Sequence, residues 1–99
     1  MEHELKTYPE PFAVSSAGVK RFEYRKNDRD YEVGDTLYLR EWDPMTGEFT
    51  GCWLRELVTY VLRGPDFGVP EGFAILSTRG IEAGYGPRKQ PSCTMRAVA

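Results

Sequence analysis

The sequence predicts a small, mainly β domain in which about five strands and one or two short helices form a closed or half-open barrel. Three observations predict this fold class. The chain of 99 residues is enough for one compact core. Apolar and polar residues alternate over several short segments. The connections are of turn length and rich in Gly, Pro, Asn and Asp. A small barrel fills its interior with side chains, so we expect a functional site at a rim or beside the helix.

The first strand and the helix occupy the N-terminal part of the chain. Residues 3–7 alternate in polarity and predict a short strand with Leu5 facing inward. Pro11 suits the first turn of a helix, so we expect a short helix over residues 12–17. Gly18 then ends this helix, because glycine readily adopts the left-handed conformation found after many helix C-termini.

Two further strands follow, separated by polar turns. Residues 21–27 place Phe22 and Tyr24 on one face of a strand and their charged and polar neighbours on the other. Residues 27–35 contain Asn, Asp and Gly, which favour turns. Residues 36–42 alternate clearly and predict a strand with its leucines on one face.

The second half of the chain predicts a hairpin and a last core strand. Residues 43–48 carry Pro and Gly at turn positions. Residues 50–63 return as a long strand, which we expect to bend or bulge near residues 55–56. A loop rich in Gly and Pro then leads to the last strand, residues 73–78.

Periodicity ends after the last strand. We therefore expect one domain over residues 1–79 and a flexible basic tail over residues 80–99. The chain has no apolar run near the roughly 20 residues of a membrane span, and its N-terminus is polar, which together favour a cytoplasmic protein. The net charge of −2 means that any binding to phosphate must be local.

Few residues are available as soft metal ligands. Cys52 and Cys93 lie far apart in the sequence, and the chain has one histidine. This composition predicts neither a zinc site nor a disulfide, and we expect no metal and no cofactor. We interpret the histidine, His3, as a structural hydrogen-bonding residue rather than a catalyst.

The segment from residue 18 to residue 25 is the best candidate for chemistry. Gly18 frees the backbone to leave the helix, and Lys20 follows in the connection. Glu23 and Arg25 share one face of the next strand. We expect Lys20 and Glu23 to meet in one cleft, where an amine and an acid can exchange a proton.

This segment has the pattern Gly-x-Lys-x-x-Glu-x-Arg, which resembles the signature of the ASCH family, a branch of the PUA-like barrels. The wider chain resembles a phage and bacterial subfamily of unknown function, the DUF3850 proteins. That resemblance covers residues 3–78 and includes the order and spacing of several segments. These segments are residues 3–6, 22–29, 33–35, 43–51 and 58–62.

The resemblance implies two functions. ASCH domains are held to bind RNA, and some small ASCH proteins are amidohydrolases that remove the acyl group from N4-acetylcytidine with a lysine, a threonine and a glutamate. Lys20 matches that lysine, and Glu23 stands where those enzymes carry the threonine. Glu71, in the loop before the last strand, is our candidate for the glutamate.

We therefore expect an amidohydrolase acting on an N4-acylated cytidine or a similar modified nucleoside. Its catalytic residues would be Lys20, Glu23 and Glu71, with proton transfer by Lys20 and Glu23. The substrate would be bound by neighbouring side chains, namely Tyr24, Arg25, Asn27 and Arg29.

Three alternatives stay open. Lys20 and Glu23 form an ordinary surface ion pair in the simplest of them. In the second, the domain is a non-catalytic RNA-binding module that uses the same cleft, with the basic residues between 21 and 29 on phosphates and Tyr24, Tyr31 or Trp42 stacking on a base. In the third, it is a phage accessory protein that binds a host protein.

Overall fold

The computed structural model describes residues 1–86 and shows a mainly β domain with a five-stranded sheet and one α-helix. The sheet order is β1-β3-β4-β5-β2, with β1 and β3 parallel and the other pairs antiparallel. In chain order the elements are β1 (Glu2–Thr7), α1 (Pro9–Ser16), β2 (Phe22–Lys26), β3 (Thr36–Asp43), β4 (Glu48–Arg63), a 3-10 turn (Asp66–Gly68) and β5 (Phe73–Tyr85).

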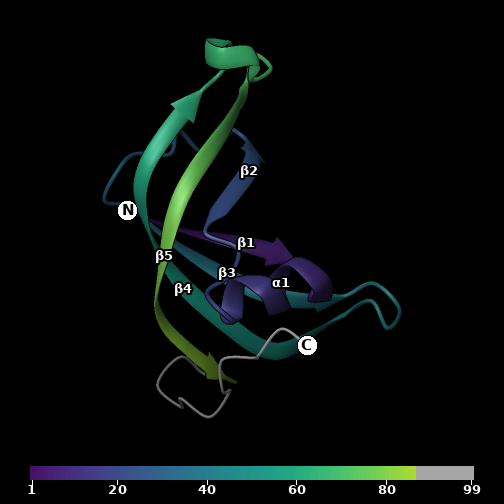
Figure 1. The fold of residues 1–99 in the computed structure, drawn as a ribbon. Coiled ribbons are helices and arrows are strands. Elements are labelled where there is room, and N and C mark those ends of the chain that lie inside the picture. Colours follow the sequence, from purple (N-terminus) through teal and green to yellow (C-terminus); the bar gives the residue numbers. More distant parts are fainter. Residues whose placement is uncertain (87–99) are drawn as a thin grey trace.

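The sheet curls into a half-barrel. The two longest strands, β4 and β5, form a curved ribbon along the whole molecule, with β2 beside β5 and β1 beside β3 (Figure 1). The edge strand β1 is joined to β2, and to the turn that follows β2, by arginine side chains rather than by a backbone ladder. Arg29 Nη1 donates to Glu4 O at 2.8 Å, and Arg25 reaches Thr7 Oγ1 at 3.3 Å. The small barrel that the sequence predicts is therefore confirmed, with one side closed by charged side chains.

The core lies inside the curl and follows the alternation of the strands. In β3, Leu37 and Leu39 are fully buried, while their neighbours along the strand are only partly covered. Phe12 from α1 packs into the same cluster from one end. The helix begins at Pro9, three residues earlier than the sequence predicts, because proline is accommodated in a first helical turn.

The last strand runs further than the sequence predicts. β5 continues to Tyr85 and pairs with β4 over residues 52–55, so residues 80–85 are not part of a tail. The sequence-based prediction treated the glycines after residue 79 as residues that end the strand. Gly84 instead lies against the Trp53 ring, where any Cβ would overlap the indole, and a strand glycine often marks such a close approach. The remainder of the expected tail, with Cys93, lies outside the described residues.

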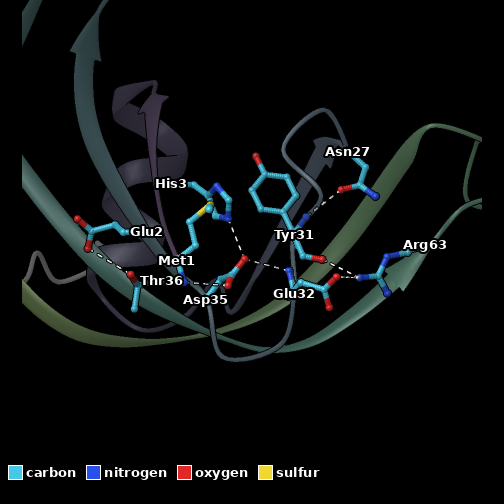
Figure 2. A network of polar contacts seen from close by, with 9 residues as sticks. All are labelled: Met1, Glu2, His3, Asn27, Tyr31, Glu32, Asp35, Thr36 and Arg63. Carbon is cyan, nitrogen blue, oxygen red and sulfur yellow. Dashed lines mark hydrogen bonds and ion pairs between the residues drawn. The ribbon is translucent and has the colours of Figure 1, made fainter.

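A buried polar network holds the turn before β3 against β1. His3 Nε2 lies 2.8 Å from Asp35 Oδ2, and Glu32 N donates to the same carboxylate at 3.0 Å (Figure 2). Burial disfavours the charge of Asp35, but these hydrogen bonds outweigh it and lower the pKa of that carboxyl. Tyr31 packs edge-on against the His3 ring, with ring centroids 4.8 Å apart. The structural role predicted for His3 agrees with this arrangement.

No helix within residues 1–86 is long and apolar enough to cross a membrane.

Candidate active site

Glu23 is the centre of a buried ion-pair cluster. It points inward from β2 and is only 3% exposed, whereas Phe22 and Tyr24 on the other face of the strand are about half exposed. Glu23 Oε2 accepts a hydrogen bond from Lys20 Nζ at 2.7 Å, and Glu23 Oε1 accepts one from Arg25 Nε at 3.0 Å. The structure thus brings together the three residues that the sequence motif singled out.

The local backbone explains the position of Lys20. Gly18 has φ +75°, the left-handed conformation that a C-terminal glycine adopts easily. The chain then turns back, so that the N–H groups of Val19 and Lys20 both donate to Val14 O. Lys20 Nζ also donates to Phe22 O at 2.6 Å. The ammonium group is therefore held in one place by two acceptors, and its side chain is 19% exposed.

A second carboxyl group, that of Glu56, faces the same region from β4. Its side chain points into the barrel between Leu54 and Val58, and the residue is 2% exposed. Burial raises the pKa of Glu56 from 4.5 to about 7, and the negative charge of Glu23 adds to this rise, while Lys20 opposes it. Near neutral pH, Glu56 therefore exists in both protonation states.

An irregularity in the sheet positions Glu56. The pairing of β4 with β5 shifts register between Arg55 and Glu56, since Arg55 lies opposite Glu82 but Glu56 lies opposite Gly80. This is the bulge that the sequence predicts for residues 55–56. A bulge bends the strand and redirects its side chains, and bulges are frequent beside active sites.

A cleft of about 480 Å³ lies beside Lys20 and Glu56. Lys20 and Glu56 both line it, together with the end of α1 and the middle of β5. A second hollow of about 380 Å³ is also lined by Lys20, together with Glu23 and Arg25. Lys20 thus lines both hollows. The lining of the larger one is Ser15, Gly18, Lys20, Arg21, Glu56, Thr59, Thr78, Arg79 and Gly80.

Three hydrogen-bonding atoms in the larger cleft have no partner within the described part of the chain. They are Ser15 Oγ, Glu56 Oε1 and Thr78 Oγ1, and all three residues are buried. The hydroxyl of Thr78 is near enough to lower the pKa of Glu56, yet neither atom completes a hydrogen bond. Buried polar atoms are nearly always paired in folded proteins, so these three atoms require partners that the described residues do not supply.

The remaining predicted substrate-binding residues lie outside this cleft. Tyr24 is half exposed on the outer face of β2 and stacks on Phe73, with centroids 5.5 Å apart. Asn27 Oδ1 accepts a hydrogen bond from Tyr31 N, so it caps its own turn. Arg29 bonds the backbone of β1. Tyr31 is 1% exposed and is therefore not a base-stacking surface.

Glu71 does not join the cluster. It is exposed in the loop that precedes β5. The neighbouring Gly72 accepts a hydrogen bond from Asn27 N, which lies just after the end of β2. Lys20 lies before the start of β2, so Glu71 and Lys20 are at opposite ends of this strand. The five residues of β2 span roughly 16 Å. Glu56 is the second carboxyl group, after Glu23, that the structure brings to the cleft lined by Lys20. The sequence signal for it was an acid at an inward position of an alternating strand.

No group of three or more His, Cys, Asp or Glu side chains suitable for a metal ion occurs among residues 1–86.

Comparison with known proteins gives a family but no activity. The family model described as "Domain of unknown function (DUF3850)" matches residues 2–78. An "Uncharacterized 12.9 kDa protein in GpA 3'region" from Escherichia phage P2 is 46% identical over 59 residues. This match covers 60% of the chain, and the chain spans about half, 52%, of the phage protein.

Proposed function

We propose that this chain, which belongs to the DUF3850 family, is a small amidohydrolase that removes the acyl group from N4-acylated cytidine or a similar modified nucleoside. The observation that carries the proposal is one cleft with a fixed ammonium group, Lys20, and a carboxyl group, Glu56, whose pKa is about 7. The resemblance of the Gly18 to Arg25 segment to the ASCH signature and the small half-barrel support the same choice.

The first step would be the addition of water to the acyl carbonyl carbon. The ionised form of Glu56 takes a proton from the water as its oxygen attacks, and a pKa near the working pH suits a general base. The carbonyl oxygen becomes an oxyanion beside Lys20, which donates a hydrogen bond and supplies positive charge. Glu23 positions the ammonium group through the bond at 2.7 Å, and Arg25 in turn holds Glu23 through the bond at 3.0 Å.

The second step would break the bond between the acyl carbon and the exocyclic nitrogen of the base. Glu56 returns its proton to that nitrogen as the bond breaks, so the leaving group departs as a neutral amine. The products are a carboxylic acid and cytidine, and the two together contain the atoms of the amide and one water. Glu56 ends the cycle ionised, as it began.

The structural alternative is that these charges only stabilise the fold. A buried ion pair is weak evidence for stability, because the loss of hydration offsets much of the attraction. Glu56 fits that alternative poorly, because its Oε1 atom is buried without a partner. A hydrophobic residue at this inward position, between Leu54 and Val58, would be buried at a lower free-energy cost than a carboxyl group.

A second candidate function, RNA binding without catalysis, rests on a different surface. Phe22, Tyr24 and Phe67 are all exposed and line a shallow groove of about 380 Å³ on the outer face of β2 and β5. Exposed aromatic rings suit base stacking. The third candidate, a phage accessory protein that binds a host protein, rests on the relative from phage P2.

Hydrolysis of N4-acetylcytidine, followed by ultraviolet absorbance, separates these functions. We expect turnover by the parent and none by Lys20→Met, which keeps the length of the side chain but not its charge. The matched control is Glu71→Gln, which removes an exposed carboxylate outside the cleft and should leave turnover unchanged. Absence of turnover in the parent, together with salt-dependent binding of oligoribonucleotides, would favour the RNA-binding function instead.

A further inference from the structure

The inner wall of the larger cleft has unused hydrogen-bonding capacity from three separate elements. Ser15 Oγ comes from α1, Glu56 Oε1 from β4 and Thr78 Oγ1 from β5, and each is buried without a partner among the described residues. The three residues are 2%, 2% and 5% exposed. Burying unpaired polar atoms is costly, and all three residues line one cleft, so a polar ligand that enters this wall would supply the missing partners.

The chemistry of this wall fits a group that both donates and accepts hydrogen bonds. The hydroxyls of Ser15 and Thr78 can each donate or accept. Glu56, with a pKa of about 7, can also act in either sense near neutral pH. The edge of a pyrimidine base, with its amide-like nitrogen and carbonyl groups, has this mixture of donors and acceptors.

The mouth of the cleft has the opposite character, because it carries arginines without acidic partners. Arg79 follows Thr78 directly in β5, and Arg21 accepts a hydrogen bond at its backbone oxygen from Thr78 N at 2.9 Å. Both arginines line the cleft and are exposed. Among residues 1–86, neither arginine forms an ion pair, although Arg21 Nε donates to Gly18 O. Two exposed guanidinium groups without ion pairs, beside a polar pocket, favour phosphate, which arginine binds through paired hydrogen bonds.

We infer that the cleft takes a pyrimidine nucleoside 5′-monophosphate rather than the free nucleoside. The base would enter against Ser15, Glu56 and Thr78, and the phosphate would lie between Arg21 and Arg79. The volume of about 480 Å³ is within the range of small-molecule sites. This inference rests on the proposed function for the identity of the base as an acylated cytosine, and it adds the phosphate as a specificity determinant.

Calorimetric titration of the full chain with cytidine 5′-monophosphate and with cytidine tests the inference without requiring turnover. We expect the monophosphate to bind about tenfold more tightly, and its affinity to fall as salt is added. The variant Arg79→Gln should remove most of this preference. The charge-matched control is Lys26→Gln, which removes an exposed cation outside the cleft and should preserve the preference.

The inner wall needs its own variant. Thr78→Val keeps the shape of a buried side chain and removes its hydroxyl, so we expect weaker binding of both ligands by a similar factor, with a cooperative unfolding transition retained. If Thr78→Val binds both ligands as the parent does, the base is not held at this wall and the inference is wrong.

Several outcomes would overturn the inference while leaving the proposed function intact. Hydrolysis of N4-acetylcytidine and its 5′-monophosphate with equal kcat/KM would show that the phosphate is not recognised. Tighter binding of a short oligoribonucleotide than of the mononucleotide would also contradict it. Failure of the proposed function is distinct, because it would appear as tight binding of cytidine 5′-monophosphate with no hydrolysis of either acylated form.

Discussion

The ionisation of Glu56 should make the stability of this protein depend on pH in a direction opposite to that of an ordinary paired carboxylate. Its pKa is 4.5 when unfolded and about 7 when folded. A raised folded pKa contributes stability that is fully present below pH 4.5 and is lost as pH rises through 7. The whole shift is worth about 3 kcal/mol at 1.36 kcal/mol per pKa unit.

The variant Glu56→Gln isolates this contribution because glutamine is neutral at every pH. Between pH 5 and pH 8, the parent should lose about 2 to 3 kcal/mol of unfolding free energy from this group alone. The variant lacks that loss, so its stability relative to the parent should rise by the same amount over this interval. Any constant effect of the substitution cancels when the two pH values are compared.

Urea unfolding followed by tryptophan fluorescence measures both proteins at pH 5 and pH 8. Trp53 is a suitable probe because its ring is buried and donates to Gly86 O at 3.1 Å. The control is Glu71→Gln, an exposed carboxylate whose removal should leave the pH dependence of the parent unchanged. Parallel pH profiles for the parent and Glu56→Gln would refute the argument that burial keeps this carboxyl partly protonated.

Three further predictions concern other parts of the molecule. Replacing Glu23 by Ala should lower the unfolding free energy by about 3 kcal/mol in urea titrations, because Lys20 and Arg25 then face each other without their shared carboxylate. Asp35→Asn should lower the unfolding free energy by about 2 kcal/mol near neutral pH. The loss should shrink as the pH falls below 3.8, because a carboxyl group whose pKa is lowered by folding stabilises the protein only in its ionised form. Gly84→Ala should lower the thermal midpoint, because the added Cβ overlaps the Trp53 ring; an unchanged midpoint would show that the indole moves aside.

The fold could be predicted from the sequence wherever alternation was strong. The leucines of residues 36–42 indicated β3 and its inner face, and the position of the bulge at residues 55–56 was also correct. The prediction failed after residue 79 because glycine has two uses in strands. Gly84 permits close contact with the Trp53 ring inside a strand, but in the sequence such a glycine looks the same as one that ends a strand.

The candidate site was predicted in part. Lys20, Glu23 and Arg25 are close in sequence and lie on one face, so their meeting followed from the pattern. Glu56 comes from another strand, and only the sheet register brings it to the same cleft. The second carboxylate was therefore sought in the loop at Glu71, since a sequence motif contains no information about which distant strand lies opposite.

The outer groove remains a separate surface. Phe67 lines this groove but neither of the two hollows lined by Lys20, so substitutions at Phe67 test RNA binding or protein binding without altering the proposed chemistry. Phe22 is less suitable, because Lys20 Nζ lies 4.8 Å from the centroid of its ring. Phe67→Ser changes a side chain that is 93% exposed and should not affect hydrolysis. This separation allows each candidate function to be examined alone.

The most direct test of the central claim is the pH dependence of N4-acetylcytidine hydrolysis, measured as kcat/KM from pH 5 to pH 9. We expect the rate to rise with pH and to level above about pH 7, as Glu56 becomes ionised and can act as the base. In Glu56→Gln, the rate should fall by at least about a hundredfold and the rise near pH 7 should disappear. Absence of hydrolysis by the parent at every pH, or an unchanged profile in Glu56→Gln, would contradict the account.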